Sequence, residues 1–278
     1  MPHAYTNGIV TFYEDSGDGP AVVLIHGHSL DLRMWQYQVG PLVEAGFRVV
    51  RYDVRGHGRS LIPPDGYTWE NYSADLAELL DRLNVERPAT QSLIVDAAHV
   101  VGLSMGGGIA LQFALDHPGR VLSLTLVDST LPGFTYSEEF SRGIEELRDA
   151  VRSEGVRAAF ERLWLTHPVF DGVRRYPERF ALVREMVLGF QAAEYREGPS
   201  PSGYSQPAVA DRLSGISASA LVVAGDQDLP DFRLIADLLA TNLPSVRQLM
   251  MPDCGHLPPL EQPEAFNAAL LAFLRDHR

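Results

Sequence analysis

Short apolar runs separated by longer amphipathic segments constrain the fold of this chain more than any other feature. The runs are continuously apolar, which is typical of strands buried on both faces of a parallel sheet. The segments between them carry apolar residues at helical spacing, and this alternation indicates an α/β fold with a mostly parallel sheet. The predicted strands are Ile9–Tyr13, Ala21–Ile25, Phe47–Tyr52, Ala98–Gly102, Leu122–Val127, Ala220–Ala224 and Arg247–Met251.

The connections between the strands predict further local structure. The turn Gly17-Asp18-Gly19-Pro20 suggests that the first two strands pair as a hairpin. One predicted helix stops before Pro118, as proline demands, and another has Asp231 as its expected N-cap. The extra residues Pro88–Asp96 have no function that we can assign from the sequence. The predicted helices are Tyr67–Leu83, Met105–Asp116, Phe232–Leu239 and a last one from Pro263 to about Arg275.

The stretch from Gly133 to Arg212 interrupts the alternation of strands and helices. It shows no convincing strand and is rich in aromatic residues. We interpret residues 133–212 as a helical cap, or lid, inserted into an α/β core formed by residues 1–132 and 213–278. The helical segments expected inside it are Ser137–Ser153, Val156–Leu165 and Glu178–Phe190.

Charge and cysteine content exclude several classes of function. The 278 residues include 23 Lys and Arg against 36 Asp and Glu, so the net charge is −13. Such a chain repels phosphate backbones, and we expect no nucleic-acid partner. Its one cysteine, Cys254, cannot form an internal disulfide and is interpreted as a buried loop residue. No signal peptide and no apolar run of about 18 residues is visible, so we expect a cytoplasmic protein without a membrane span.

The segment Gly102-Leu103-Ser104-Met105-Gly106 lies between a predicted strand and a predicted helix. A serine on such a sharp turn occupies a strained backbone conformation, and the two glycines leave room around it. The helix that follows directs its first N–H groups at the site where an oxyanion would form. This pattern predicts Ser104 as a nucleophile.

Four motifs in this order resemble the α/β-hydrolase superfamily, and the resemblance covers nearly the whole chain outside residues 133–212. It implies an α/β-hydrolase fold, with a mostly parallel sheet of about eight strands, flanking helices and an inserted helical cap. The motifs are Leu24-Ile25-His26-Gly27-His28, Tyr52-Asp53-Val54-Arg55-Gly56-His57-Gly58-Arg59-Ser60, the serine turn, and Asp253-Cys254-Gly255-His256.

A serine nucleophile needs a base, and nine histidines are available. In the superfamily the base lies on the loop after the last strand, where His256 stands. The acid that orients the base lies between the serine and the histidine in chain order, and the family pattern Gly-x-x-Asp selects Asp228. Two alternatives stay open: Asp128, one strand earlier, where some relatives carry the acid, and Asp226, which could instead cap its turn.

The resemblance also implies an oxyanion hole made by the backbone N–H groups of Met105 and His28. The side chain of His28 leaves two interpretations, a hydrogen bond to a polar substrate or a wall of the pocket. In such proteins His26 usually braces the oxyanion loop, and His57 belongs to a structural turn. The histidines lack metal-ligand spacing and a Ser-His-Asp site needs no metal, so we expect no metal and no cofactor.

Serine chemistry at the turn points to an acyl-enzyme, since dehalogenase and epoxide hydrolase relatives carry an aspartate there. The serine turn and the ending Gly255–Glu264 look like small bacterial carboxylesterases and enol-lactonases. We therefore predict a carboxylesterase for a small or medium ester, with Ser104 as nucleophile, His256 as base and Asp228 as orienting acid.

Two alternatives to the esterase remain, and the oligomeric state and natural substrate stay open. The same triad could hydrolyse a lactone, or a C–C bond in a vinylogous diketone whose carboxylate would need a lid arginine. A small-molecule receptor on the same scaffold would bind without turnover. The candidate arginines are Arg142, Arg174, Arg175 and Arg184.

Overall fold

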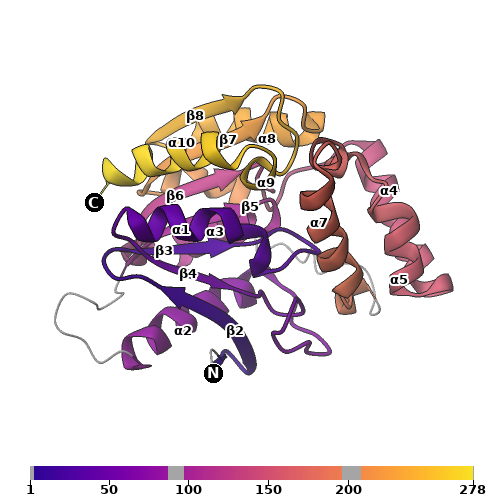
Figure 1. Cartoon of the computed structure of the whole chain (residues 1–278), viewed down its shortest axis with the longest axis horizontal. Coiled ribbons are helices and arrows are strands. Elements are labelled where there is room, and N and C mark those ends of the chain that lie inside the picture. Colours follow the sequence, from indigo (N-terminus) through magenta and orange to yellow (C-terminus); the bar gives the residue numbers. More distant parts are fainter. Residues whose placement is uncertain (1–2, 87–96, 196–207, 278) are drawn as a thin grey trace.

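The computed structural model describes residues 3–86, 97–195 and 208–277, and its centre is one eight-stranded sheet (Figure 1). The strand order is β1-β2-β4-β3-β5-β6-β7-β8. The first two strands are antiparallel to their neighbours, and the other six run parallel. The strands are β1 (His3–Thr6), β2 (Ile9–Ser16), β3 (Ala21–Ile25), β4 (Arg48–Tyr52), β5 (Ala98–Leu103), β6 (Val121–Val127), β7 (Ser219–Gly225) and β8 (Val246–Met251).

All seven predicted strands are present, but the predicted hairpin is wrong. Strand β2 pairs with β4, and β4 separates it from β3. The turn after β2 packs instead against the residues just before β4. A Cβ on Gly17 would lie 2.5 Å from the carbonyl oxygen of Phe47, and a Cβ on Gly19 would lie 2.3 Å from that of Gly46. The glycines therefore allow this turn to pass close to the backbone before β4, and they do not mark a hairpin between β2 and β3.

The sequence reasoning missed β1, which forms the real hairpin with β2. Its turn is Asn7-Gly8, and both residues have positive φ, 42° and 80°. An Asn-Gly pair with this geometry is the strongest short hairpin signal in a sequence. That signal was present beside the first predicted strand.

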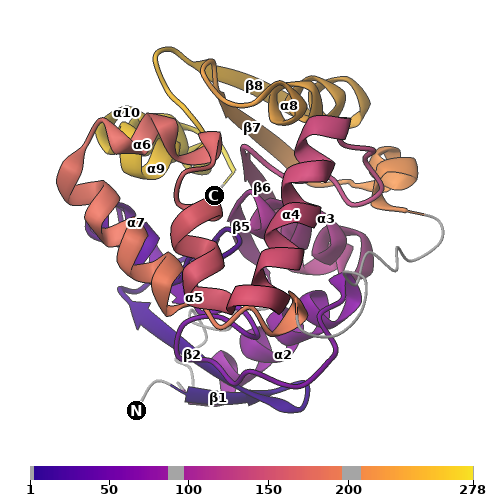
Figure 2. The ribbon, with the colours of Figure 1, turned by 90° about the vertical axis from the view of Figure 1, so that its right-hand side faces the viewer.

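Helices cover both faces of the sheet. Figure 2 shows α10 on one side of it and α2, α3 and α8 on the other, and α1 packs against α10. The last helix begins at Pro263 and ends at Arg275, as predicted. Outside the segment between β6 and β7, the α-helices are α1 (Gln36–Glu44), α2 (Trp69–Glu86), α3 (Met105–Asp116), α8 (Pro230–Asn242), α9 (Pro258–Glu261) and α10 (Pro263–Arg275).

The chain between β6 and β7 forms helices joined by turns and loops in its described part, residues 128–195 and 208–218, which contains no strand. We call it the β6–β7 segment. In Figure 1 its helices α4, α5 and α7 stand beside one end of the sheet. Helical structure is confirmed at all three predicted stretches, although the second continues as a π-helical turn at Phe160–Trp164. The helices are α4 (Glu138–Glu154), α5 (Val156–Ala159), α6 (Asp171–Arg174) and α7 (Pro177–Gly189).

The extra residues Pro88–Asp96 lie outside the described residues. Across the described part of the chain, no helix is both long enough and apolar enough to cross a bilayer.

Candidate active site

The candidate nucleophile Ser104 sits where β5 ends and α3 begins. Its backbone has φ 53° and ψ −114°, a conformation that costs about 1–3 kcal/mol for a residue with a Cβ. Glycines permit the close packing around it: a Cβ on Gly102 would lie 2.1 Å from the carbonyl oxygen of Gly106. A Cβ on Gly106 would lie 2.2 Å from the carbonyl oxygen of Ile25 on the neighbouring strand β3. The strained turn thus holds the serine at the ends of the central strands.

His256 and Asp228 are brought together from the loops after β8 and β7. The imidazole Nδ1 of His256 lies 2.7 Å from Oδ2 of Asp228, and Oδ1 of Asp228 accepts the N–H of Leu229 at 2.7 Å. Both side chains are buried. The ring of Phe232 packs on the imidazole, with 4.3 Å between centroids. This arrangement orients one ring nitrogen of His256 toward a carboxylate.

Ser104 and His256 line the same cavity, which has a volume of about 250 Å³. Its walls are mostly apolar and come from both the sheet loops and the β6–β7 segment. His28 and Met105, whose amides are the expected oxyanion donors, also line it. A Cβ on Gly27 would lie 3.5 Å from the Cβ of Ser104, so the loop that carries His28 passes directly beside the nucleophile.

The side chain of His28 belongs to the wall of this cavity and is also hydrogen-bonded. Its Nε2 lies 2.9 Å from the hydroxyl of Tyr195, and its Nδ1 lies 3.7 Å from Oε1 of Glu194. Burial, followed by the charge of His26, lowers the pKa of His28 to about 4, while burial raises the pKa of Glu194 to about 7. At pH 6 both groups are therefore neutral, and their contact is polar without being an ion pair.

His26 and His57 brace the loop around residues 27–29. His26 donates from Nδ1 to the carbonyl of Gly27 at 2.8 Å, and its Nε2 accepts the N–H of Val54 at 2.9 Å. The Nε2 of His57 accepts the N–H of Ser29 at 3.3 Å. Burial lowers the pKa of both imidazoles. Both rings are thus neutral supports for the loop, which is the role that the resemblance implied for His26; for His57 it implied only a place in a structural turn.

Glu261 is a site residue to which the sequence reasoning assigned no role. Its buried carboxylate accepts the N–H of Gly255 at 2.7 Å and the N–H of Leu257 at 3.0 Å, the two residues that flank His256. Arg175 of the β6–β7 segment lies 3.4 Å from the same carboxylate. The acidic residue five positions after His256 was the available signal, but its partners are backbone groups that spacing does not reveal.

The remaining aspartates and the cysteine take distinct places. Asp128 is fully buried and accepts the N–H of Gly225 at 3.1 Å, whereas Oδ1 of Asp226 lies 3.4 Å from the N–H of Cys254. The prediction that Asp231 caps α8 is wrong, because the N-cap is Leu229. Cys254 is completely buried, as predicted.

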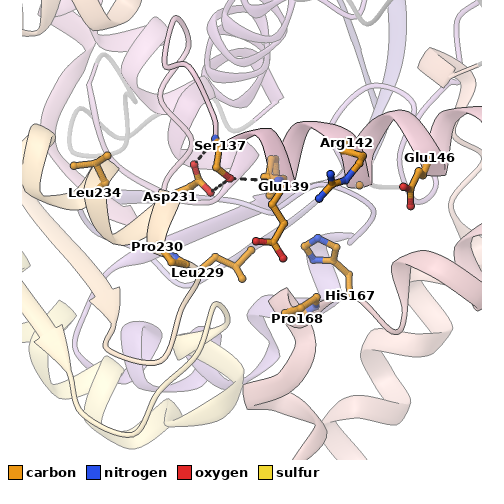
Figure 3. Close-up of a pocket in the computed structure, with 12 residues that line it drawn as sticks. Ser137, Glu139, Arg142, Glu146, His167, Pro168, Leu229, Pro230, Asp231 and Leu234 are labelled. Carbon is orange, nitrogen blue, oxygen red and sulfur yellow. Dashed lines mark hydrogen bonds between the residues drawn. The ribbon is translucent and has the colours of Figure 1, made fainter.

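Asp231 instead joins α8 to the start of α4. Its two carboxylate oxygens accept the N–H and the hydroxyl of Ser137, each at 2.7 Å (Figure 3). Ser137 is the N-cap of α4 and offers both groups to a carboxylate that is distant in sequence. The position of Asp231 at the start of a helix suggested a cap, but its carboxylate binds Ser137 of another segment instead.

A larger cavity of about 680 Å³ lies between α4 and α8. Phe140 lines both this groove and the cavity of Ser104. Figure 3 shows Glu139 and Arg142 of α4 on one side of the groove and His167 on the other. Burial, followed by the charge of His256, lowers the pKa of His167 to about 4. His167, which lines the groove, is thus close enough to His256 for their charges to interact.

In the described part of the chain, two groups of three side chains each bring together atoms of the kind that bind metal ions. Within each group these atoms lie within 4.8 Å of one another. One is the cluster of Asp128, Asp228 and His256; the other is His28, His57 and Glu194. The second group could not be found from sequence spacing, because its members come from three distant segments. Its histidines already contact Tyr195 and the amide of Ser29.

Comparison with known proteins identifies the family. The model of the alpha/beta hydrolase fold family matches residues 20–263. This chain belongs to that family. The resemblance noted in the sequence and the predicted fold class are thereby confirmed.

Several members of the family are similar over nearly their whole length. A thermophilic esterase from Thermogutta terrifontis has 30% sequence identity and a TM-score of 0.81, covering 100% of this chain and 98% of its own. Est816, described as an N-acyl homoserine lactone degrading enzyme, has 31% identity and a TM-score of 0.79, covering 98% and 100%. The 3-oxoadipate enol-lactonase 1 of Acinetobacter baylyi is 27% identical, covering 93% of this chain and 90% of its own.

Proposed function

We propose that this alpha/beta hydrolase cleaves a small or medium carboxylic ester through an acyl-enzyme on Ser104. The observation that carries the proposal is the 2.7 Å contact between His256 and Asp228, with His256 and Ser104 lining one cavity. His256 takes the serine proton as the hydroxyl attacks the ester carbonyl and returns it to the leaving alcohol. Asp228 fixes the tautomer of the imidazole and stabilises the imidazolium.

The backbone N–H groups of Met105 and His28 are the proposed donors to the oxyanion. Met105 begins α3, so the positive end of the helix dipole adds to its N–H. A Cβ on Gly27 would lie 3.5 Å from the Cβ of Ser104, and this close approach of the loop that carries His28 supports the proposal for its amide. Losing one such donor typically costs about 10²–10³ in kcat.

The cavity limits the size of the substrate. Its volume of about 250 Å³ lies below the roughly 300–1,000 Å³ of most ligand pockets. Its apolar walls, including Trp164, Phe170 and Phe232, suit a short hydrocarbon group. We propose that residues 133–212 act as the cap over this cavity, because α4 and the turn at Phe160–Trp164 supply part of its lining.

A substrate panel tests the proposal. We expect hydrolysis of p-nitrophenyl acetate and butyrate, a steep fall in rate for long acyl chains, and loss of turnover in Ser104→Ala. Asp228→Asn should lower kcat by orders of magnitude with little change in KM. Unchanged hydrolysis in Ser104→Ala would contradict the proposal.

One observation favours a second candidate, hydrolysis of a lactone or a vinylogous diketone that carries a carboxylate. Arg174 contacts the carbonyl of Leu165, and Arg175 contacts that of Asp253, whereas Arg142 lines the groove that shares Phe140 with the catalytic cavity. Arg142 could therefore receive a substrate carboxylate. Arg142→Gln would then raise KM for carboxylated substrates and leave KM for uncharged esters unchanged.

A further inference from the structure

Asp128 is a buried carboxyl group with one oxygen unaccounted for. It follows β6, and its Oδ1 accepts the N–H of Gly225 at 3.1 Å. Its Oδ2 is buried, and no hydrogen-bond partner reaches it within the described part of the chain. The backbone of Asp128 has φ 39°, in the left-handed region that Asp and Asn tolerate better than most residues. A buried oxygen without a partner is costly unless it carries a proton and donates it.

The neighbours of Asp128 supply the acceptor. One oxygen of Asp128, one of Asp228 and a ring nitrogen of His256 all lie within 4.8 Å of one another. Asp228 already accepts the N–H of Leu229 and faces Nδ1 of His256, and donors directed at a carboxylate favour its charged form. Two ionised carboxylates this close, in a buried site, would repel strongly.

The electrostatic surroundings favour the neutral form of Asp128. Burial and the charge of Asp228 raise the pKa of Asp128 well above its usual range, although the N–H of Gly225 opposes them. Of the other titratable groups around it, Glu261 raises this pKa further, and the buried thiol of Cys254 is also nearby.

We propose that Asp128 is a positioning residue that carries a proton on Oδ2 and donates it in a hydrogen bond to the carboxylate of Asp228. This inference rests on the proposed Ser104–His256–Asp228 mechanism. The bond gives the buried Oδ2 its partner and holds the carboxylate that orients His256. It also withdraws negative charge from Asp228, so that the proton taken from Ser104 stays on His256 and does not pass to Asp228.

Two substitutions separate this role from a merely structural one. Asp128→Asn keeps an acceptor for Gly225 and an N–H donor for Asp228. We expect its kcat/KM to stay within about threefold of wild type, with the acid limb of the pH–rate profile unmoved. Asp128→Ala removes the donor, and we expect kcat to fall about 10- to 100-fold with KM unchanged and the acid limb displaced to higher pH, because an unneutralised Asp228 favours the imidazolium.

An ionised Asp128 would give the opposite pattern. Replacing its charge by the neutral amide would then move the acid limb to lower pH by about 2.5 units, from Coulomb's law at 4.8 Å and an effective dielectric constant of about 20. That shift would overturn the proposal, as would equal losses in both variants with no change in the pH profile. Failure of the mechanism itself is recognised separately, because Ser104→Ala would then retain turnover in the same assay.

A measurement without substrate completes the test, and it stays informative if Asp128→Ala does not fold. The free energy of unfolding of wild type and Asp128→Asn is measured by urea titration from pH 4 to pH 8. A proton held only by the folded wild type makes its stability fall with rising pH relative to the variant. We therefore expect the advantage of Asp128→Asn to grow steadily above about pH 4. A constant or shrinking difference would contradict a protonated Asp128.

Discussion

Replacing Glu261 by Gln tests how the loop of His256 is held in place. The carboxylate of Glu261 is 1% exposed and accepts the backbone N–H groups of Gly255 and Leu257, on either side of the histidine. In the glutamine variant one oxygen can still accept, but the other becomes an amide N–H₂ that faces a backbone N–H. One charge-assisted hydrogen bond is lost and a buried donor is left without an acceptor.

The magnitude follows from these two losses. Hydrogen bonds to charged groups contribute about 1.5–3 kcal/mol, and a buried unsatisfied donor costs about 1–3 kcal/mol, so we expect a loss of about 3 kcal/mol. The ion pair with Arg175 adds little, since the arginine side chain is 46% exposed. With about 2 cal/mol/K of unfolding entropy per residue over 278 residues, Tm should fall by about 5 °C.

The same substitution should lower kcat, because the loop positions the base. A displacement of about 1 Å can cost about 10²-fold in rate, whereas KM depends on the cavity walls and should hardly change. The assays are thermal unfolding by circular dichroism and steady-state hydrolysis of p-nitrophenyl butyrate. Glu264→Gln is the matched control: Glu264 is exposed in the first turn of α10, and its loss should cost under about 1 kcal/mol without affecting kcat. If Glu261→Gln gave the same Tm and kcat as this control, the positioning argument would be refuted.

Two further predictions concern the serine turn and pH. Gly106→Ala should prevent correct folding or lower Tm strongly, because its Cβ would lie 2.2 Å from the carbonyl oxygen of Ile25; a soluble variant with wild-type Tm would contradict the tight turn. Burial raises the pKa of Glu194 to about 7, so the folded protein holds a proton between about pH 4.5 and 7 that the unfolded chain releases. Its stability should therefore fall as pH rises through this window, by up to about 3 kcal/mol from this group, and Glu194→Gln should remove that part of the slope in urea titrations. If stability changed with pH in the same way in wild type and variant, the prediction of a raised pKa for Glu194 would be contradicted.

The strands and the order of the site residues could be predicted from the sequence, because each depends on local pattern. Continuous apolar runs mark strands that are buried on both faces, such as β3 and β5. All seven predicted strands are present, although the edge strand β8 is mostly exposed. The glycines on either side of Ser104 marked a turn that the structure shows to be crowded. The pairing of His256 with Asp228 came from chain order and the family pattern, and the two side chains do meet.

Apart from β1, whose Asn7-Gly8 turn is a local signal, the features that escaped prediction depend on contacts between distant segments. The glycines before Ala21 suggested a hairpin between β2 and β3. In the structure β4, which follows α1 in the chain, lies between these two strands. Asp231 looked like a helix cap, yet Ser137, far away in sequence, offers it two donors. Spacing carries no information about such partners, because they are set by how the β6–β7 segment packs on the sheet loops.

The central claim is that Ser104 forms an acyl-enzyme, and mass spectrometry tests it most directly. The protein is mixed with p-nitrophenyl butyrate, quenched in acid within the first turnovers, and its intact mass and peptides are measured. We predict one added butyryl group on the peptide that contains Ser104 and no adduct in Ser104→Ala. In His256→Ala both acylation and deacylation are slow, and where deacylation is the slower step the variant accumulates more adduct than Ser104→Ala. A butyryl group on another residue, or full turnover by Ser104→Ala, would contradict the account.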